Sequence, residues 1–285
     1  MVGAYYYDRE GKTRARNMGG NVLRSTFFFA DGRDFSRSFI EYKAVYGQVH
    51  YDLTDQLSVD AEGRYGQDKR SIPFNAVTTR PVGSSINSFT PRLSVDYKVD
   101  DDTLVYASYA VGALPGGFNT GVFSRTATGP TDAEFARLQS EGKTVFGTEK
   151  NYVYIVGVKS TLMDGKLAFN GDIFNIDWKK QKINNIEQII TPNGPGVVSI
   201  QTNSGSSSVQ GVEFSTSYLA SENLTLAASY GLADHVFKAA NDLQIAQFTG
   251  VPEHPTLRTG GNAKGKHSIL APKHSGSARS PGPTI

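Results

Sequence analysis

Hydrophobic and polar residues alternate with a period of two along much of this chain, which is the pattern of β-strands with one apolar face. The alternation is clearest in segments 57–65, 92–99, 213–218 and 224–230. Applied to the whole chain, the pattern predicts nine long strands. They span residues 2–7, 39–53, 57–67, 88–99, 103–111, 152–163, 166–178, 209–220 and 224–233.

The connections between these strands differ sharply in length. Four are tight turns, at Thr54-Asp55-Gln56, Asp100-Asp101-Asp102, Asp164-Gly165 and Ser221-Glu222-Asn223. The four hairpins that these turns close are separated by three long polar loops, roughly over residues 68–87, 112–150 and 184–208. Short turns at one end and long loops at the other are typical of outer-membrane β-barrels. The prediction is therefore an all-β antiparallel meander of about nine long strands, with its long loops outside the cell.

Charged residues occupy only one of the two alternating phases in the clearest strands. They are Asp60, Glu62, Arg64, Arg92, Asp96, Lys98 and Glu213. A Lys or Arg on a lipid-facing position costs about 2–4 kcal/mol at the bilayer midplane. We therefore expect these seven residues to face the lumen of a barrel and the apolar phase to face lipid.

A soluble β-sandwich shows the same alternation with its apolar phase turned inward, so alternation alone leaves both folds open. Strand length favours the barrel. Segment 42–53 alternates over 12 residues, whereas transmembrane strands need about 9–11 residues and the mean globular strand has about 5–6.

Composition narrows the classes of protein that remain possible. Of the 285 residues 38% are hydrophobic, and no run approaches the length of a transmembrane helix. The chain has no cysteine, which excludes disulfides and thiolate chemistry. Its net charge of +2 is too weak to indicate a nucleic-acid partner. No signal peptide is recognisable at the start of the sequence.

Two segments depart from the strand pattern. Residues 131–139 predict a short helix inside a loop, capped by Thr131 or Asp132. Residues 260–285 are small, basic and rich in Gly, Ser and Pro, which predicts a disordered or aberrant tail. The expected division is a partial barrel over 1–259 and this tail over 260–285.

Several strings in the chain resemble those of the TonB-dependent outer-membrane receptors. They are Phe89-Thr90-Pro91-Arg92-Leu93-Ser94-Val95-Asp96-Tyr97, Asp101-Asp102-Thr103-Leu104-Val105-Tyr106-Ala107-Ser108-Tyr109 and Leu114-Pro115-Gly116-Gly117-Phe118-Asn119. Further strings at 46–55, 158–167 and 209–226 follow in the family's order, so that the likeness covers roughly residues 1–275.

This resemblance implies a 22-stranded transmembrane β-barrel with an N-terminal plug domain. It also implies a receptor in the outer membrane of a Gram-negative cell, which imports a scarce ligand with energy from TonB. Ferric siderophores, cobalamin, haem and glycans are the ligands implied. The lumen-facing charges would then contact the plug or water, and lipid would surround the barrel.

The sequence departs from the family at both ends. No plug-like segment or TonB-contacting segment is recognisable, so neither contact is assigned to a residue. After Pro272-Lys273-His274-Ser275 the strand pattern gives way to small residues and prolines. We therefore expect a partial gene product that ends in a truncation or frameshift. We also expect that the chain does not transport alone, because the unpaired backbone groups at its strand edges cost several kcal/mol each in lipid.

The sequence offers little for catalysis or metal binding. Its five histidines are His50, His235, His254, His267 and His274, and none has the spacing of a metal site. Asp234 and His235 are merely adjacent, which is weak support for a hydrolase. We expect no enzyme activity, no metal and no cofactor.

Ligand contact is expected in the loop region 112–150, without named residues. Pro115, Gly116, Gly117, Phe118 and Asn119 are expected to form a structural turn at the barrel rim, because paired glycines permit a sharp bend. The basic run 179–182 is expected to be a solvated charge cluster, with lipopolysaccharide phosphate or an anionic ligand as alternatives.

Aromatic residues near strand ends are expected to form interfacial girdles. They are Tyr51, Tyr97, Tyr106, Tyr109, Phe174, Trp178, Tyr218 and Tyr230. Two alternatives to a receptor stay open: a small autonomous or porin-like barrel, and a soluble β-sandwich binding module.

Overall fold

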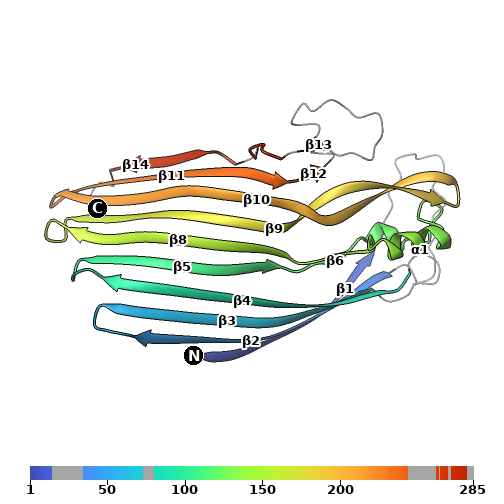
Figure 1. Cartoon of the computed structure of the whole chain (residues 1–285), viewed down its shortest axis with the longest axis horizontal. Coiled ribbons are helices and arrows are strands. Elements are labelled where there is room, and N and C mark those ends of the chain that lie inside the picture. Colours follow the sequence, from blue (N-terminus) through green and yellow to red (C-terminus); the bar gives the residue numbers. More distant parts are fainter. Residues whose placement is uncertain (15–34, 73–79, 243–260, 263, 269–270, 281–285) are drawn as a thin grey trace.

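A computed structural model describes residues 1–14, 35–72, 80–242, 261–262, 264–268 and 271–280. Ten strands form one antiparallel sheet in chain order, each beside the next (Figure 1). They are β1 (Val2–Arg14), β2 (Phe35–Asp52), β3 (Leu57–Ile72), β4 (Val82–Lys98), β5 (Thr103–Leu114), β8 (Glu149–Leu162), β9 (Leu167–Thr191), β10 (Gly194–Ser221), β11 (Leu224–Ala239) and β14 (His274–Arg279). The predicted antiparallel meander is confirmed, and β1 and β14 are not paired with each other.

The four tight turns are confirmed at one end of the sheet (Figure 1). At the first, Leu53 N donates to Leu57 O at 2.8 Å, and the Thr54 hydroxyl accepts from the backbone of Gln56. Such side-chain acceptors satisfy turn N–H groups that have no strand partner. At the third turn Asp164 and Gly165 have φ angles of 53° and 84°, the left-handed region that glycine and short polar residues tolerate best.

The predicted long loop 184–208 is wrong. β9 and β10 continue as a hairpin as far as Thr191 and Gly194, where a second tight turn joins them. The prediction failed because the outer half of β10 is rich in Gly, Ser and Asn, which are weak strand formers. Register shifts on either side of Gly205 also interrupt the alternation there.

The loop predicted at 68–87 is also shorter than expected. β3 runs to Ile72 and β4 begins at Val82, and residues 73–79 lie outside the described part of the chain. Strand pairing continues from Gln67 with Asn87 up to Ile72 with Val82. Backbone pairing therefore extends beyond the segment where side-chain alternation is legible.

Loop 112–150 folds into short elements: β6 (Gly117–Phe118), η1 (Thr120–Phe123), α1 (Asp132–Ser140) and β7 (Val145–Phe146). The helix predicted at 131–139 is confirmed within one residue. The Thr131 side chain accepts a hydrogen bond from Glu134 N, as an N-cap residue does. Among the described residues, no helix is long and apolar enough to span a membrane.

The chain near its end differs from the expected tail at one place. β14 pairs with β11 from Leu232–His274 to Ala227–Arg279. Its sequence of small residues shows no alternation, but backbone hydrogen bonds do not require one. The expectation of disorder is therefore wrong for 274–279, whereas residues 260, 263, 269–270 and 281–285 lie outside the described chain. The division at 259/260 stays a prediction.

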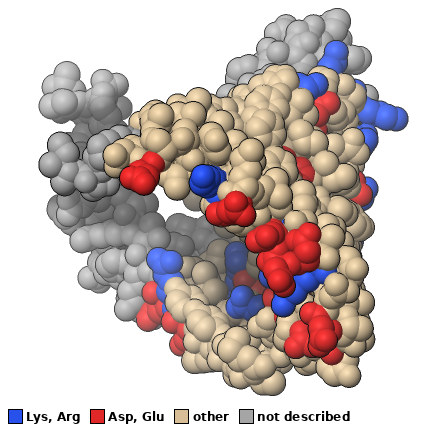
Figure 2. Space-filling model, turned by 90° about the vertical axis from the view of Figure 1, so that its left-hand side faces the viewer, with Lys and Arg blue, Asp and Glu red and all other residues tan. Residues whose placement is uncertain are grey.

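The two faces of the sheet differ in chemistry and in exposure. We call them the apolar face, which carries Val49, Leu93 and Tyr154, and the charged face, which carries Glu62 and Arg92. On β4 the neighbours Leu93 and Ser94 lie on opposite faces and are 46% and 9% exposed. Figure 2 looks along the strands from the tight-turn end and shows the sheet bent around a hollow. The greater exposure of the apolar face is expected of the outer side of such a bend.

A soluble β-sandwich would cover its apolar face with a second sheet. In the described part of the chain the other sheets are only two-stranded, β6 with β7 and β12 (Asn241–Asp242) with β13 (Gly261–Asn262). Apolar side chains such as Val49 and Ile173 remain 65% and 58% exposed. The sandwich alternative is therefore not the fold of this chain.

Candidate ligand-binding site

The register of the sheet brings the seven predicted charged residues onto the same face. Asp96, Tyr106, Gly157, Asp172 and Glu213 are successive partners across β4, β5, β8, β9 and β10. The other predicted residues are Asp60, Glu62, Arg64, Arg92 and Lys98, and they share the phase of this row on β3 and β4. That this face lines a lumen stays a prediction.

The charges on this face are partly paired. Arg92 Nη1 lies 3.3 Å from Glu62 Oε1 across β3 and β4. His50 bridges Asp60 at 3.0 Å and Asp52 at 3.2 Å. Exposed ion pairs of this kind contribute only about 0–1 kcal/mol. These groups therefore retain much of their capacity to bind an external partner.

A tyrosine pocket of about 830 Å³ lies on the charged face of β1, β2 and β3. Its walls include Tyr5, Tyr7, Tyr42, Tyr46 and Arg64. The Arg64 guanidinium lies 5.2 Å from the ring centroid of Tyr42, and the Tyr5 ring lies 6.0 Å from that ring. Aromatic faces beside a guanidinium favour flat, anionic or aromatic groups.

Two glycines make room for these rings. A Cβ at Gly66 would collide with the hydroxyl of Tyr42, and a Cβ at Gly3 would collide with that of Tyr46. The sequence prediction missed this pocket. Its only signal is the spacing of the tyrosines by even numbers within each strand, which places them all on one side.

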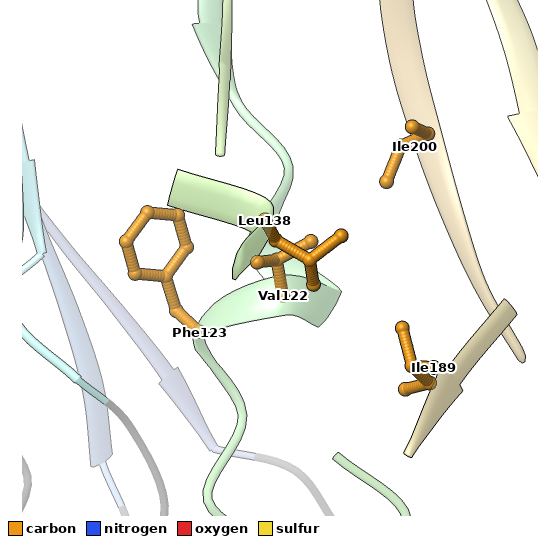
Figure 3. Packing of buried hydrophobic residues seen from close by; sticks show 5 residues of the cluster. All are labelled: Val122, Phe123, Leu138, Ile189 and Ile200. Carbon is orange, nitrogen blue, oxygen red and sulfur yellow. The ribbon is translucent and has the colours of Figure 1, made fainter. Parts of the chain in front are cut away.

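Loop 112–150, at the end of the sheet opposite the tight turns (Figure 1), is held by a small apolar core. Val122, Phe123 and Leu138 come from loop 112–150, and Ile189 and Ile200 come from the β9–β10 hairpin (Figure 3). We call this assembly, residues 112–150 with 183–202, the loop unit. The predicted ligand-contact region is therefore a packed structure and presents a fixed surface.

Arg80 anchors the loop unit to the start of β4. Its buried guanidinium donates to Asp132 at 2.7 Å, to Ser124 O at 2.9 Å and to Pro130 O at 3.0 Å. The same group lies 4.5 Å from the centroid of the Phe135 ring. The hydrogen bond from Arg80 holds the pKa of the Asp132 carboxyl below its usual range.

A second charged network ties α1 to β9. Arg137 donates to Glu134 at 2.6 Å, to Glu141 at 2.8 Å and to Glu187 at 3.2 Å. Lys143 adds contacts to Glu141 at 2.7 Å and Glu187 at 2.9 Å. The Lys143 ammonium, followed by Arg137, holds the pKa of Glu141 below its usual range.

The predicted rim turn makes structural contacts. Asn119 donates to Lys143 O at 2.8 Å and accepts from Gln201 N at 2.7 Å. Pro115 O accepts from Lys182 Nζ at 2.9 Å. A Cβ at Gly116 would collide with the carbonyl oxygen of Phe146. These contacts join the turn to Lys143, to β9 and to β10. That the turn has a structural role at a barrel rim stays a prediction.

The lysines of the basic run 179–182 lie in different environments. Lys182 is largely buried and lies 3.5 Å from the buried Glu149, whose carboxylate also accepts from Trp178 Nε1 at 2.7 Å. Lys179 is exposed on the opposite face, and Lys180 has a positive φ of 54°. Lys182 is thus part of an internal ion pair and not of a solvated run.

The predicted aromatic girdle residues also separate between the faces. Five share the apolar face, namely Tyr51, Tyr97, Tyr109, Tyr218 and Tyr230. Three fall on the charged face, namely Tyr106, Phe174 and Trp178, so the expectation of a girdle role is wrong for them. Side chains alternate strictly within a strand, and closeness to a strand end does not fix the face.

The histidines do not converge. In the described part of the chain, no group of His, Cys, Asp and Glu is arranged to hold a metal. Asp234 and His235 are neighbours on β11 and point to opposite faces. Asp234 instead pairs with His267 at 2.8 Å. His254 lies outside the described residues.

A meander of long strands with an exposed apolar face, tight turns at one end and folded loops at the other defines part of a transmembrane β-barrel. The chain belongs to the family described as TonB dependent receptor-like, beta-barrel, which it matches over residues 1–280. Members of this family are transporters and not enzymes.

Solved structures of similar fold agree with this assignment. The ferric yersiniabactin uptake receptor FyuA of Yersinia pestis is 18% identical, with 87% of this chain and 32% of that one covered and a TM-score of 0.58. The ferripyoverdine receptor of Pseudomonas aeruginosa is 14% identical, with 98% and 32% covered and a TM-score of 0.56. The copper transporter OprC is 11% identical, with 82% and 35% covered and a TM-score of 0.56. The chain thus spans about a third of the length of these proteins.

Proposed function

We propose that this chain forms part of the wall of an outer-membrane receptor that captures a scarce ligand and imports it with energy from TonB. The observation that supports this most is the separation of the two faces, one apolar and exposed, the other charged and only partly paired. A lipid-facing belt needs the first, and a polar lumen needs the second.

In this proposal the charged face contacts water and the plug domain of the receptor. The incompletely paired Glu62, Arg92 and Asp60 supply hydrogen-bonding groups toward the lumen. The gated passage of the ligand would run along this wall. No residue of the chain is assigned to the contact with TonB.

Ligand capture would involve the loop unit and the tyrosine pocket. The loop unit offers a rigid outer surface because its own core and ion pairs hold it in place. The tyrosine pocket offers aromatic faces with Arg64 beside them. The proposed ligand classes are ferric siderophores, cobalamin, haem and glycans, and the first is favoured because FyuA and the ferripyoverdine receptor carry such ligands in their names.

The single tryptophan provides a direct assay. Trp178 lies on the charged face beside Glu149, below the loop unit. The full chain, folded in detergent, is titrated with a ferric siderophore, cobalamin, haem and an oligosaccharide while tryptophan emission is recorded. We expect saturable quenching by one class, weakened by Arg64→Gln and unchanged by the matched variant Lys69→Gln on the apolar face of the same strand.

Two outcomes contradict the proposal in different ways. If none of the four classes changes the emission, the chain has no ligand site of its own. If the chain dissolves without detergent and melts cooperatively, the membrane-barrel assignment itself fails. Heat-modifiable migration on a gel, in which the unboiled barrel moves differently from the boiled chain, is the accompanying check on folding.

A further inference from the structure

The outer end of the β9–β10 hairpin carries an Asn-Gly sequence in an exposed turn. Within the described chain, β9 has no β8 partner beyond Lys179, and β10 has no β11 partner before Ser206. Beyond these points the two strands pair with each other up to the turn between Thr191 and Gly194 (Figure 1). Asn193 lies in that turn and is exposed. Such a tip is where the backbone of a hairpin opens at the lowest cost.

The backbone of this turn is ordered, while the side chain of Asn193 is free to move. The Thr191 hydroxyl accepts a hydrogen bond from Asn193 N at 3.2 Å and donates to Gly194 O at 2.8 Å. The amide group of Asn193 has no hydrogen-bond partner in the described chain. The buried Asn119 differs, because its amide donates to Lys143 O at 2.8 Å.

Gly194 leaves room for a reaction between its backbone nitrogen and the neighbouring side chain. Its φ angle is 107°, in the region that favours glycine, and a Cβ at this position would meet nothing within 4 Å. The Gly194 nitrogen and the Cγ atom of Asn193 belong to adjacent residues, so a bond between them closes a succinimide ring. Because glycine has no side chain, this approach meets little steric resistance.

A second Asn-Gly sequence in the same chain provides the contrast. Asn170 is also exposed, and Gly171 follows it within β9. Here, however, Asn170 pairs with Lys159 on β8 and with Ser215 on β10. The backbone is extended between two strands and cannot rotate toward the ring geometry without breaking their pairing. The two sequences are thus alike in exposure and differ in backbone freedom.

We propose that Asn193 is a site of spontaneous deamidation. The Gly194 nitrogen loses its proton to hydroxide and bonds to Asn193 Cγ, and the Cγ–Nδ2 bond breaks to release ammonia. Water then opens the succinimide at either of its carbonyl carbons, which leaves aspartate or isoaspartate at position 193. The sum is one water consumed and one ammonia released, without oxidation or reduction.

The reaction changes the surface of the loop unit, to which the tip belongs. A neutral amide becomes a carboxylate on the hairpin that supplies Ile189 and Ile200 to the core of the unit. Isoaspartate also lengthens the backbone by one carbon atom within the turn. The charge of this tip therefore depends on the age of the chain and on pH, because hydroxide starts the reaction. The site stands on the turn geometry and is independent of any ligand.

The test uses the full chain, folded in detergent and incubated at mildly alkaline pH. Peptide mapping by mass spectrometry follows deamidation at both Asn-Gly sequences in the same sample. We expect conversion at Asn193 to be at least about tenfold faster than at Asn170, because opening paired strands costs more than opening a turn. In concentrated urea, which unfolds the chain, we expect the two rates to agree within about twofold.

Matched variants locate the charge that appears on ageing, which ion-exchange chromatography measures. Asn193→Gln is expected to remove most of the gain in negative charge, because the longer side chain closes the ring poorly. Asn170→Gln is expected to leave the gain unchanged. Asn193→Asp is expected to elute from the start with the aged form of the unaltered chain. Heat-modifiable migration confirms that each variant is folded.

Three results would overturn the site. Equal conversion at Asn193 and Asn170 in the folded chain shows that strand pairing does not select between them. Conversion at Asn193 that is slower in the folded chain than in urea by more than about tenfold shows that the turn protects this residue. An undiminished gain in negative charge by the Asn193→Gln variant places the reaction elsewhere.

Discussion

The ten-stranded sheet, which we call the wall, and the loop unit are stabilised in different ways. The wall relies on backbone pairing across ten strands, and many of its large apolar side chains are exposed. The loop unit has buried residues such as Val122 and Leu138, together with the networks of Arg80 and Arg137. The comparison indicates that the apolar face of the sheet has no cover within the described chain, whereas the loop unit carries its own core.

The largest expected effect comes from a substitution in the apolar core of the loop unit. Leu138 is 0% exposed, and Leu138→Ala should destabilise the unit by about 2–5 kcal/mol because it leaves a cavity. Hydrogen exchange should show faster exchange in α1 and in the outer half of the β9–β10 hairpin. Leu162→Ala, at an exposed wall position, should leave these protections unchanged; equal loss in both variants would contradict a separate core.

The second prediction tests the surroundings of the wall. Val158 lies on the apolar face in the middle of β8, so Val158→Lys should cost about 2–4 kcal/mol in a bilayer. The control is Ser108→Lys on the charged face of β5, which should cost far less. Unfolding by urea in vesicles measures both. If the two variants are equally stable, the apolar face does not face lipid.

The third prediction concerns the rim turn. Asn119 is buried, and its amide joins the loop to Lys143 O and Gln201 N. Asn119→Ala leaves these backbone groups unsatisfied, at a cost of about 1–3 kcal/mol. Limited proteolysis should cut loop 112–150 faster. Unchanged cutting, with the neighbouring Thr120→Ala as a control, would show that the turn is not anchored by this side chain.

The smallest expected effect is a dependence on pH. The pKa values of Asp132 and Glu141 are depressed in the folded chain, by Arg80 and by Lys143 respectively. A depressed carboxyl pKa contributes stability above its unfolded value, and the contribution is lost as the pH falls through the folded value. Proteolytic resistance of the loop unit should therefore fall on acidification below about pH 4. Arg80→Gln should flatten this dependence, and Lys69→Gln on the wall should not.

Sequence reasoning succeeded where one physical signal dominated. Strands such as 57–67 and 88–99 can be predicted because one of their two alternating phases excludes charge. The helix at 131–139 can be predicted from its N-cap at Thr131. It failed at 184–208, where Gly, Ser and Asn hide the alternation while backbone pairing continues. It also failed at 274–279, where pairing with β11 needs no side-chain pattern at all.

The candidate site was less predictable than the fold. The seven charged residues followed from phase alone, and they share a face as the pattern requires. The tyrosine pocket depends on which strands are neighbours and on the space above Gly3 and Gly66. The sorting of the basic run between two faces depends on the bulge near Lys180. Local sequence patterns do not predict such contacts between residues that are distant in the chain.

The central claim is that the apolar face meets lipid while the charged face meets water. The chain has no cysteine, so single cysteines can be placed along β8 from 152 to 162 and spin-labelled in vesicles. Collisions with oxygen and with a water-soluble nickel complex report lipid and water, respectively. We expect high oxygen access at even-numbered positions, such as Val156 and Val158, and high nickel access at the odd-numbered ones. Uniform access to the nickel complex at both sets would contradict this claim.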